Sequence, residues 1–203
     1  MVGLDADPVF LEHARARARE QGLGNVELVE GDVYRTGLPR ASFDLVHVRF
    51  VASTAGRAQE LLREAIALAR PGGVVALQEP DISTLKCYPQ HDAWDRLAQI
   101  LEQVFASTGG NVRLARELYA LVRSAGLENV EYRPFLVGFD SRHEMVDYLP
   151  ATVESVRAAI ERLNVISEAD LNAALAACRA HLARADTVST YVTVAQVWGR
   201  RLL

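Results

Sequence analysis

Short apolar segments alternate with helical segments through the first half of the chain, and this alternation constrains the fold more than any other feature. Pro8 suits a first helical turn, and Gly22 and Gly24 end the helix that it opens. Strands separated by helices of this length predict a parallel sheet with helices on both faces and right-handed crossovers. The expected strands are 1–5, 26–30, 43–50 and 74–77, and the expected helices are 8–21 and 58–69, the second closed by Arg70-Pro71-Gly72-Gly73.

The second half of the chain is more helical. Trp94 belongs to an apolar stripe at helical spacing over 92–107, and this stripe is typical of a core-facing helix. The other expected helices are 111–126, 143–163 and 167–184, and the expected strands are 130–139 and 187–197. No linker or repeat divides the chain, so we expect a single domain over 1–203, with helical lid elements at about 91–107 and 142–184.

Composition limits the classes of partner. The net charge of -4 disfavours a nucleic-acid backbone as the main ligand. Cys87 and Cys178 are far apart and lack the spacing of a disulfide framework or a metal site. No apolar run reaches membrane-spanning length and no signal peptide opens the chain, so we expect a soluble, cytoplasmic protein without a metal.

Polar residues stand where the predicted strands end. Ligands of parallel α/β sheets bind beyond the carboxyl ends of the strands, so these residues should gather along one edge. They are Asp5, Gly31, Asp32, Arg49, Glu79 and Asp81.

This edge has groups that suit an adenosine. A carboxylate at Asp5 can accept hydrogen bonds from the ribose hydroxyls, and Ala6 offers an apolar surface to the adenine ring. Asp32 can accept from the adenine amino group, while the backbone N–H of Val33 donates to the ring. Each residue also has a simpler interpretation: Asp5 as a helix N-cap, with Asp7 as the better candidate, and Gly31-Asp32 as an ordinary turn.

Order and spacing resemble the class I S-adenosylmethionine-dependent methyltransferases. The blocks that carry the resemblance are VGLDADPVFLEHAR, VELVEGDVYRTGLPRASFDLVHVRFV, ALARPGGVVALQEPD, LYALVRSAGLENVEYRP and YVTVAQVWGRR. The resemblance implies a Rossmann-like α/β fold, with a mostly parallel sheet and an antiparallel last strand. It also implies S-adenosylmethionine as cofactor, held by Asp5, Ala6, Asp32 and Val33.

The family's fourth strand passes the methionine end of the cofactor, and His47, Val48 and Arg49 fall there. We expect Arg49 to neighbour the cofactor or the substrate, with a surface ion pair as the alternative. For His47 we favour a satisfied core histidine over a catalytic base. Candidate general bases after the fifth family strand are Glu79, Asp81 and His91, each of which also suits a purely structural role.

The family's first strand and its glycine-rich turn would lie upstream of Met1. That strand is central in the family, so a sheet without it has two rows of unpaired backbone groups. Three explanations are open: an upstream start, a strand donated by a second chain, or direct pairing of the two flanking strands with a damaged cofactor site.

The implied reaction is transfer of a methyl group to a small, partly apolar acceptor, with Tyr88, Trp94, Phe139 and Tyr148 as apolar walls. One rival is a nicotinamide-dependent dehydrogenase, but the catalytic tyrosine and lysine at helical spacing are missing. The other rival is a non-catalytic remnant of the fold that acts as a binding or oligomerisation module. The acceptor and the oligomeric state stay open, a homo-oligomer being one candidate.

Overall fold

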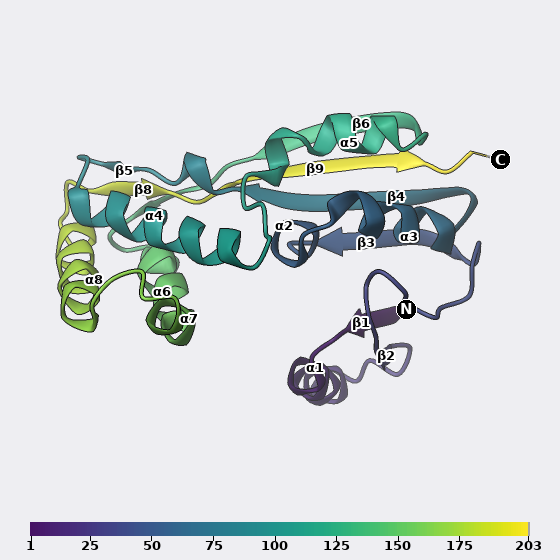
Figure 1. Cartoon of the computed structure of the whole chain (residues 1–203). Coiled ribbons are helices and arrows are strands. Elements are labelled where there is room, and N and C mark those ends of the chain that lie inside the picture. The colour runs from purple at the N-terminus through teal and green to yellow at the C-terminus, as the bar shows by residue number, and fades with distance from the viewer. Residues whose placement is uncertain (203) are drawn as a thin grey trace.

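The computed structural model describes residues 1–202, which form eight α-helices, two short 3-10 helices and nine strands (Figure 1). The helices are α1 (Pro8–Glu20), α2 (Ala52–Ala55), α3 (Ala58–Leu68), α4 (Asp92–Ser107), α5 (Leu118–Ser124), α6 (Tyr148–Ser155), α7 (Arg157–Arg162) and α8 (Glu168–Leu182), with 3-10 turns η1 (Ile82–Thr84) and η2 (Leu114–Arg116). The strands are β1 (Val2–Asp5), β2 (Glu27–Glu30), β3 (Phe43–Arg49), β4 (Ala69–Asp81), β5 (Cys87–Tyr88), β6 (Glu128–Phe135), β7 (Gly138–Asp140), β8 (Val188–Thr190) and β9 (Thr193–Arg200).

The largest sheet has four strands in the order β3-β4-β9-β6. β3 and β4 are parallel, whereas β9 runs antiparallel to both of its neighbours, β4 and β6. Three of the four strands therefore point the same way, and the last strand of the chain is inserted between β4 and β6 in the opposite direction. This arrangement confirms the predicted α/β fold with an antiparallel last strand.

Helices α3 and α5 cover one face of this sheet. Leu61 and Leu62 of α3 are buried with Leu118 of α5 against Val75 and Leu77 of β4, all at 1% exposure or less. The two helices and the sheet share one apolar cluster, so the burial of these side chains holds the helices on the sheet. The side chains of β3 alternate accordingly: Val46 and Val48 pack on this cluster, while Leu45 on the opposite face is 56% exposed.

A second apolar core lies where β4 and β9 leave the main sheet. Helices α4, α6, α7 and α8 pack there beside a three-stranded sheet of order β5-β8-β7 (Figure 1). Trp94, Leu97 and Ile100 of α4 are buried in this core, which confirms that the apolar stripe of 92–107 is core-facing. We call the elements around this core the lid.

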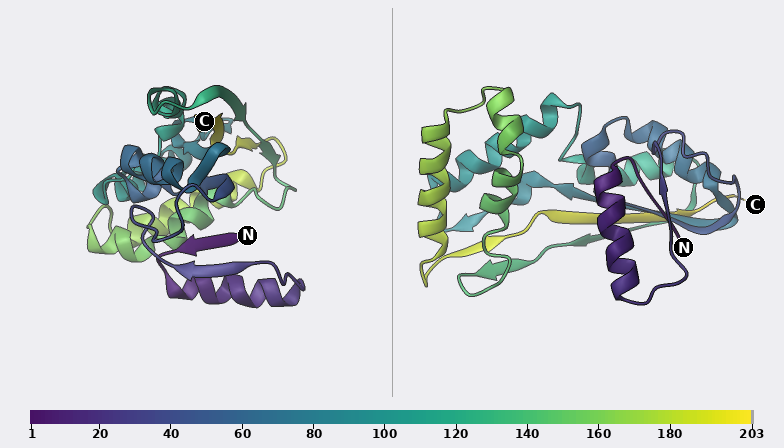
Figure 2. Two further views of the ribbon diagram at one scale, coloured as in Figure 1. Left: turned by 90° about the vertical axis from the view of Figure 1, so that its right-hand side faces the viewer. Right: turned by 90° about the horizontal axis from the view of Figure 1, so that it is seen from below.

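The N-terminal residues form a separate two-stranded parallel sheet. Within residues 1–202, β1 pairs with β2 alone, in a register that places Asp5 opposite Glu30. α1 crosses between the two strands; Asp7 caps it by accepting from the N–H of Val9 at 2.8 Å, as predicted, and Pro8 follows. Figure 2 (left) shows this β1-α1-β2 unit stacked below the rest of the molecule. β1 does not pair with β3, so the direct pairing considered from the sequence is wrong.

Several helices and strands begin or end at residues other than those expected, because the geometry of the fold overrides the helix and strand propensities of the sequence. Gly72 and Gly73 lie inside β4 instead of in a turn before it, and a Cβ at Gly73 would stand 2.9 Å from the carbonyl oxygen of Phe43. The expected strand 130–139 divides into β6 and β7, and the expected final strand divides into β8 and β9, because each crosses from the main sheet to the lid sheet. The expected helices 111–126 and 143–163 likewise divide, into η2 and α5 and into α6 and α7.

Glu79 is fully buried near the end of β4. Its two carboxylate oxygens accept hydrogen bonds from the backbone N–H groups of Ala52 and Ser53, each at 3.0 Å. These donors open α2 and would otherwise be unpaired. Burial raises the pKa of Glu79, although the hydrogen bonds that it accepts oppose the shift. One buried carboxyl group therefore fixes α2 against the sheet.

We predict that Glu79→Ala lowers the free energy of unfolding by about 3 kcal/mol, because it leaves two buried donors without an acceptor and opens a cavity. Glu79→Gln keeps one of the two acceptor oxygens and places its NH2 group against the other donor, so it should cost less than Glu79→Ala, about 2 kcal/mol. Urea titration of both variants measures these differences, and equal losses in the two variants would contradict the assigned role.

The raised pKa of Glu79 also predicts a pH dependence. The folded state retains the proton to higher pH than the unfolded state, so the free energy of unfolding falls as pH rises from the unfolded-state pKa of about 4.3 through the higher folded-state pKa. Glu79→Gln should flatten this part of the profile. A profile identical to that of the parent protein would show that Glu79 does not titrate differently on folding.

Candidate functional site

The carboxyl ends of β1 and β2 meet at one edge. The N–H of Gly31 donates to the carbonyl oxygen of Asp5 at 3.0 Å, and Asp32 follows directly. The structure therefore brings together the two acids that the sequence places at consecutive strand ends. Both side chains are exposed at this edge, as a site for a ligand in solution requires.

Asp5 is not the helix cap. One of its carboxylate oxygens, Oδ1, accepts from the N–H of Asp7 at 2.9 Å, which shapes the turn between β1 and α1. Among residues 1–202 no donor lies within hydrogen-bonding distance of the other oxygen, Oδ2. Ala6 follows Asp5 and is exposed. Asp5 can thus hold the turn with one oxygen and accept from a ligand hydroxyl with the other.

The loop after β2 is held in shape by its own side chains. Oδ1 of Asp32 accepts from the N–H of Tyr34 at 2.9 Å, and the N–H of Arg35 donates to the carbonyl oxygen of Asp32 at 3.0 Å. The intervening N–H of Val33 has no acceptor within the described part of the chain. An exposed acid beside an available backbone donor matches the pair expected for the edge of an adenine ring.

Tyr34 anchors this loop to the C-terminal end of α2. Its hydroxyl donates to the carbonyl oxygens of Ala55 at 2.7 Å and Gly56 at 3.0 Å, and the guanidinium of Arg57 lies 3.6 Å from the centre of its ring. Sequence reasoning missed Tyr34, because its partners lie more than twenty residues further along the chain and no local motif marks them.

Glu64 of α3 provides a second anchor. Its Oε1 accepts from the backbone N–H and the hydroxyl of Thr36, at 3.1 and 2.8 Å, and its Oε2 pairs with Arg40 at 2.7 Å. Burial acts to raise the pKa of Glu64, but the hydrogen bonds from Thr36 and the Arg40 guanidinium outweigh it and lower the pKa. Glu64 and Tyr34 together fix the loop from both ends.

Arg49 ends β3 with an exposed side chain, and its guanidinium carbon lies 5.1 Å from the centre of the Phe50 ring. Phe50 itself has a φ of 57°, a left-handed conformation that is uncommon for a bulky residue and marks a sharp change of direction. Within residues 1–202 no carboxylate pairs with Arg49, so the surface ion pair considered from the sequence is not observed. His47 is exposed, and the expectation of a core histidine is wrong, because its side chain lies on the sheet face opposite α3 and α5.

A cavity of about 310 Å³ separates the N-terminal unit from β3. Its walls come from β1, β3, α3 and the loop after β2. Of the predicted cofactor-binding residues, Val33 and Arg49 line it, and so does Val48, whereas Asp5, Ala6 and Asp32 lie outside its lining. The structure thus gathers Asp5, Ala6 and Asp32 along one edge and places Val33 and Arg49 at the walls of the adjoining cavity.

The three candidate bases all have structural partners. Glu79 holds α2, as described above. Asp81 caps η1 and pairs with Arg116 at 2.7 Å; burial acts to raise its pKa, but the bonds from Arg116 and Ser83 outweigh it and lower the pKa. His91 caps α4 through Nδ1, and its ring stacks on His181 at 4.4 Å. These contacts support the structural alternative for each residue.

The predicted apolar walls of the lid are divided between core and surface. Trp94 and Phe139 are buried, whereas Tyr88 is 57% exposed. Burial and its neighbour Tyr191 raise the pKa of the Tyr148 hydroxyl, so this tyrosine stays protonated at neutral pH.

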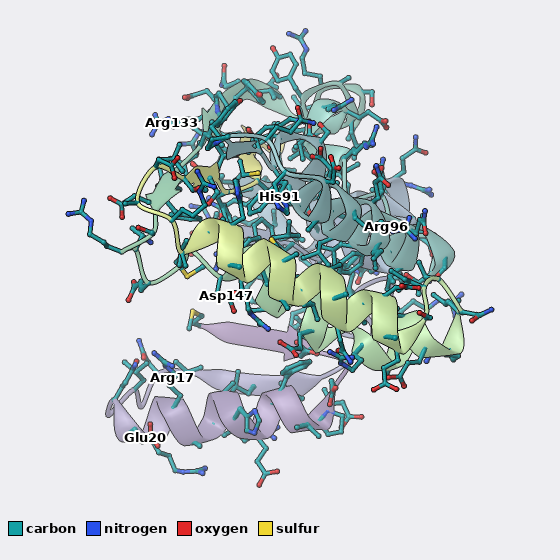
Figure 3. The ribbon with its side chains drawn as sticks, turned by 90° about the vertical axis from the view of Figure 1, so that its left-hand side faces the viewer. Arg17, Glu20, His91, Arg96, Arg133 and Asp147 are labelled. Atoms are coloured by element: carbon teal, nitrogen blue, oxygen red, sulfur yellow. The ribbon has the colours of Figure 1, made fainter. Side chains whose placement is uncertain are left out.

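Ion pairs join the lid helices. Arg179 of α8 contacts Asp147 at 2.9 Å and Glu154 at 2.7 Å, and Figure 3 shows Asp147 beside α8. Within residues 1–202 no group of three His, Cys, Asp or Glu side chains is placed to hold a metal, and both cysteines are buried free thiols. In the same part of the chain no helix is both long and apolar enough to cross a membrane.

Comparison with known proteins agrees with this geometry. Residues 1–77 match the sequence profile of the methyltransferase domain family. A demethylmenaquinone methyltransferase of Geobacillus kaustophilus is 26% identical over 153 residues, which cover 70% of this chain and 65% of the relative. The match therefore spans a little under two thirds of that relative's length.

Solved structures extend the likeness to the whole fold. The YcgJ protein of Bacillus subtilis superposes with a TM-score of 0.59 at 18% identity, over 100% of this chain and 82% of that one. Phosphoethanolamine N-methyltransferase 2 of Haemonchus contortus, in complex with S-adenosyl-L-methionine, superposes with a TM-score of 0.56 at 12% identity, over 100% of this chain and 43% of that one. Residues 1–77 thus match the methyltransferase domain family by sequence, and the fold of the chain is similar to that of S-adenosylmethionine-dependent methyltransferases.

Proposed function

We propose that the protein binds S-adenosylmethionine at the edge formed by β1, β2 and β3 and transfers its methyl group to a small, partly apolar acceptor. The hydrogen bond from Gly31 to the carbonyl oxygen of Asp5 carries this proposal, because it holds two exposed acids side by side at the ends of parallel strands. Methyltransferases of this family use S-adenosylmethionine as methyl donor.

The residues present fit the adenosine half of this cofactor. Asp5 retains a carboxylate oxygen without a donor, which suits the ribose hydroxyls, and Ala6 supports the adenine. Asp32 and the N–H of Val33 supply the acceptor and donor that the adenine edge requires. Tyr34 and Glu64 keep the loop in place before any ligand arrives, so little ordering is needed on binding.

Bound S-adenosylmethionine supplies a methyl group that its positive sulfur activates for direct displacement. The protein then acts mainly by position: Asp5, Asp32 and Val33 hold the adenosine, and Arg49 holds the carboxylate at the methionine end. The name of the demethylmenaquinone methyltransferase relative supports a small-molecule acceptor. The buried free thiols Cys87 and Cys178 fit a reducing compartment, which supports a cytoplasmic location.

We predict that Asp5→Asn and Asp32→Asn each weaken binding of S-adenosylhomocysteine by about ten- to a hundredfold, because each replaces a charge-assisted hydrogen bond with a neutral one. Isothermal titration calorimetry measures the dissociation constants. Asp7→Asn is the matched control: it makes the same chemical change two residues from Asp5, and asparagine still caps α1, so affinity should stay unchanged.

The same titrations also distinguish the proposed methyltransferase from the main alternative, a non-catalytic protein of the same fold. Heat of binding in the parent protein that is lost in Asp5→Asn but not in Asp7→Asn supports the proposed site. No heat at about 1 mM ligand, a concentration that detects binding stronger than about 4 kcal/mol, would contradict it. That outcome would favour a non-catalytic protein of the same fold that serves as a binding module.

A second prediction concerns Arg49. Arg49→Met should weaken binding of S-adenosylhomocysteine about tenfold but leave binding of 5′-methylthioadenosine unchanged, because the latter lacks the carboxylate that the guanidinium would hold. The free energy of unfolding should change by less than about 0.5 kcal/mol, since Arg49 is exposed and makes no ion pair with residues 1–202. Equal losses for both ligands would place Arg49 away from the methionine end.

A further inference from the structure

Two histidines stack where the two longest lid helices meet. His91 precedes the first residue of α4 and His181 lies in the last turn of α8; their ring centres are 4.4 Å apart, with the ring planes 28° from parallel. His181 is buried and His91 is half-buried, and Figure 3 shows His91 at the start of α4, next to α8. The other three histidines, His13, His47 and His143, are exposed. Within residues 1–202 this is therefore the one place where two imidazole rings are in contact.

Hydrogen bonds define the uncharged form of both rings. Nδ1 of His91 accepts from the N–H of Ala93 at 3.2 Å and so caps α4, which requires that this nitrogen carry no proton. Nε2 of His181 lies 2.8 Å from the carbonyl oxygen of Pro89, which can only accept, so Nε2 carries the proton of the neutral ring. A further proton therefore enters each ring at Nδ1. At His181 it breaks no hydrogen bond of residues 1–202, whereas at His91 it removes the cap of α4.

The helix termini make the two rings unequal sites for a positive charge. His181 lies at the C-terminal end of α8, where the helix dipole favours a cation, and His91 lies at the N-terminal end of α4, where the dipole disfavours one. The guanidinium of Arg184 lowers the pKa of Asp186, and a charge on His181 acts in the same direction, so Asp186 also favours protonation of His181. The first proton therefore belongs to His181. A second proton on His91 would meet a cation whose ring centre is 4.4 Å away, and would remove the cap of α4.

The charges around the pair do not compensate for a second proton. Asp95 in the first turn of α4 already accepts from Gln90 at 2.7 Å, and Asp92 is exposed, so solvent screens its charge. Burial raises the pKa of the Cys87 and Cys178 thiols, so neither supplies a negative charge at neutral pH. The remaining charged or titratable side chains at this end of the lid, most of them cations, are Lys86, Tyr88, Arg96, Arg179, Arg184 and Asp186.

Apolar contacts hold the other parts of the two helices together. Leu97, Ile100 and Leu101 of α4 and Leu171 and Leu175 of α8 are buried in the lid core. Protonation of the histidines changes none of these side chains. A separation caused by charge is therefore confined to the end of the lid that carries the two rings.

We propose that the stacked pair of His91 and His181 is a pH-sensitive contact of the lid, which joins the start of α4 to the end of α8 while at most one ring is charged and separates when both rings are protonated. Histidine changes its charge between about pH 5 and 8, so the contact is closed at about pH 7.5 and opens as the pH falls toward about 5. This inference rests on the lid alone and is independent of the proposed methyl transfer.

Amide hydrogen exchange followed by NMR tests the proposal in the full chain without cofactor. The N–H groups of Ala93, Trp94 and Asp95 all donate to His91, the first to its ring and the other two to its carbonyl oxygen, so they report on the first turn of α4. After correction for the pH dependence of intrinsic exchange, their protection should fall at least about tenfold between about pH 7.5 and about pH 5. The amides of Leu61 in α3 and its neighbours are the internal control and should keep their protection, because α3 belongs to the other core.

Two variants separate the charge of the pair from its role as a cap. His91→Asn keeps an acceptor at the start of α4 but cannot take up a proton, so it should remove the pH dependence of protection in the first turn. His143→Asn is the matched control. His143 also accepts an N–H through Nδ1, that of Met145 at 3.0 Å, but its ring lies on Phe139 and not on a second histidine, so this variant should behave as the parent protein.

His181→Gln gives an independent test from the other helix. Glutamine can still donate to the carbonyl oxygen of Pro89 but carries no charge, so this variant should flatten the same pH dependence. Equal protection of the parent protein at both pH values, a pH dependence in His91→Asn and His181→Gln that matches the parent, or an equal loss of protection in α3 would each overturn the proposal. The readout needs no cofactor, so failure to bind S-adenosylhomocysteine would leave it unaffected.

Discussion

One buried carboxyl group, Glu79, connects the sheet to the candidate cofactor site. It accepts from the first two N–H groups of α2 and so fixes that short helix at the end of β4. The C-terminal end of α2 then presents the carbonyl oxygens of Ala55 and Gly56 to the hydroxyl of Tyr34. Through these contacts the position of Asp32 and Val33 depends on a residue that never reaches the ligand edge.

The same chain of contacts explains how the N-terminal unit stays in place without a shared sheet. β1 and β2 make no backbone ladder with β3, yet the loop that follows β2 is tied to α2 by Tyr34 and to α3 by Glu64. Side-chain hydrogen bonds thus replace main-chain pairing between the two parts. A cavity lies between β1 and β3, and within residues 1–202 neither strand pairs with a further strand on that side.

The lid is built around a second apolar core, which the long strands of the chain connect to the first. β4 is 13 residues long and runs from the main sheet toward the lid, and the last two strands return along the same path. Leu77 belongs to the first core, while Ile82 and Trp94 belong to the second. Ion pairs of Arg179 with Asp147 and Glu154 join α8 to α6 and the turn before it, on the outer side of the lid.

The sequence by itself determined the alternation of strands and helices and the helix starts at Pro8, Asp92 and Glu168. It also determined that Asp5 and Asp32 stand at the ends of consecutive strands. These features depend on periodicity, capping and turn chemistry, which act over a few residues. Only the tertiary structure decided that His47 is exposed, that Tyr34 and Glu64 hold the loop, and that β1 and β3 stand apart with a cavity between them. Those outcomes depend on partners distant along the chain and on which strand edges find one another. The local pattern of side chains does not encode either.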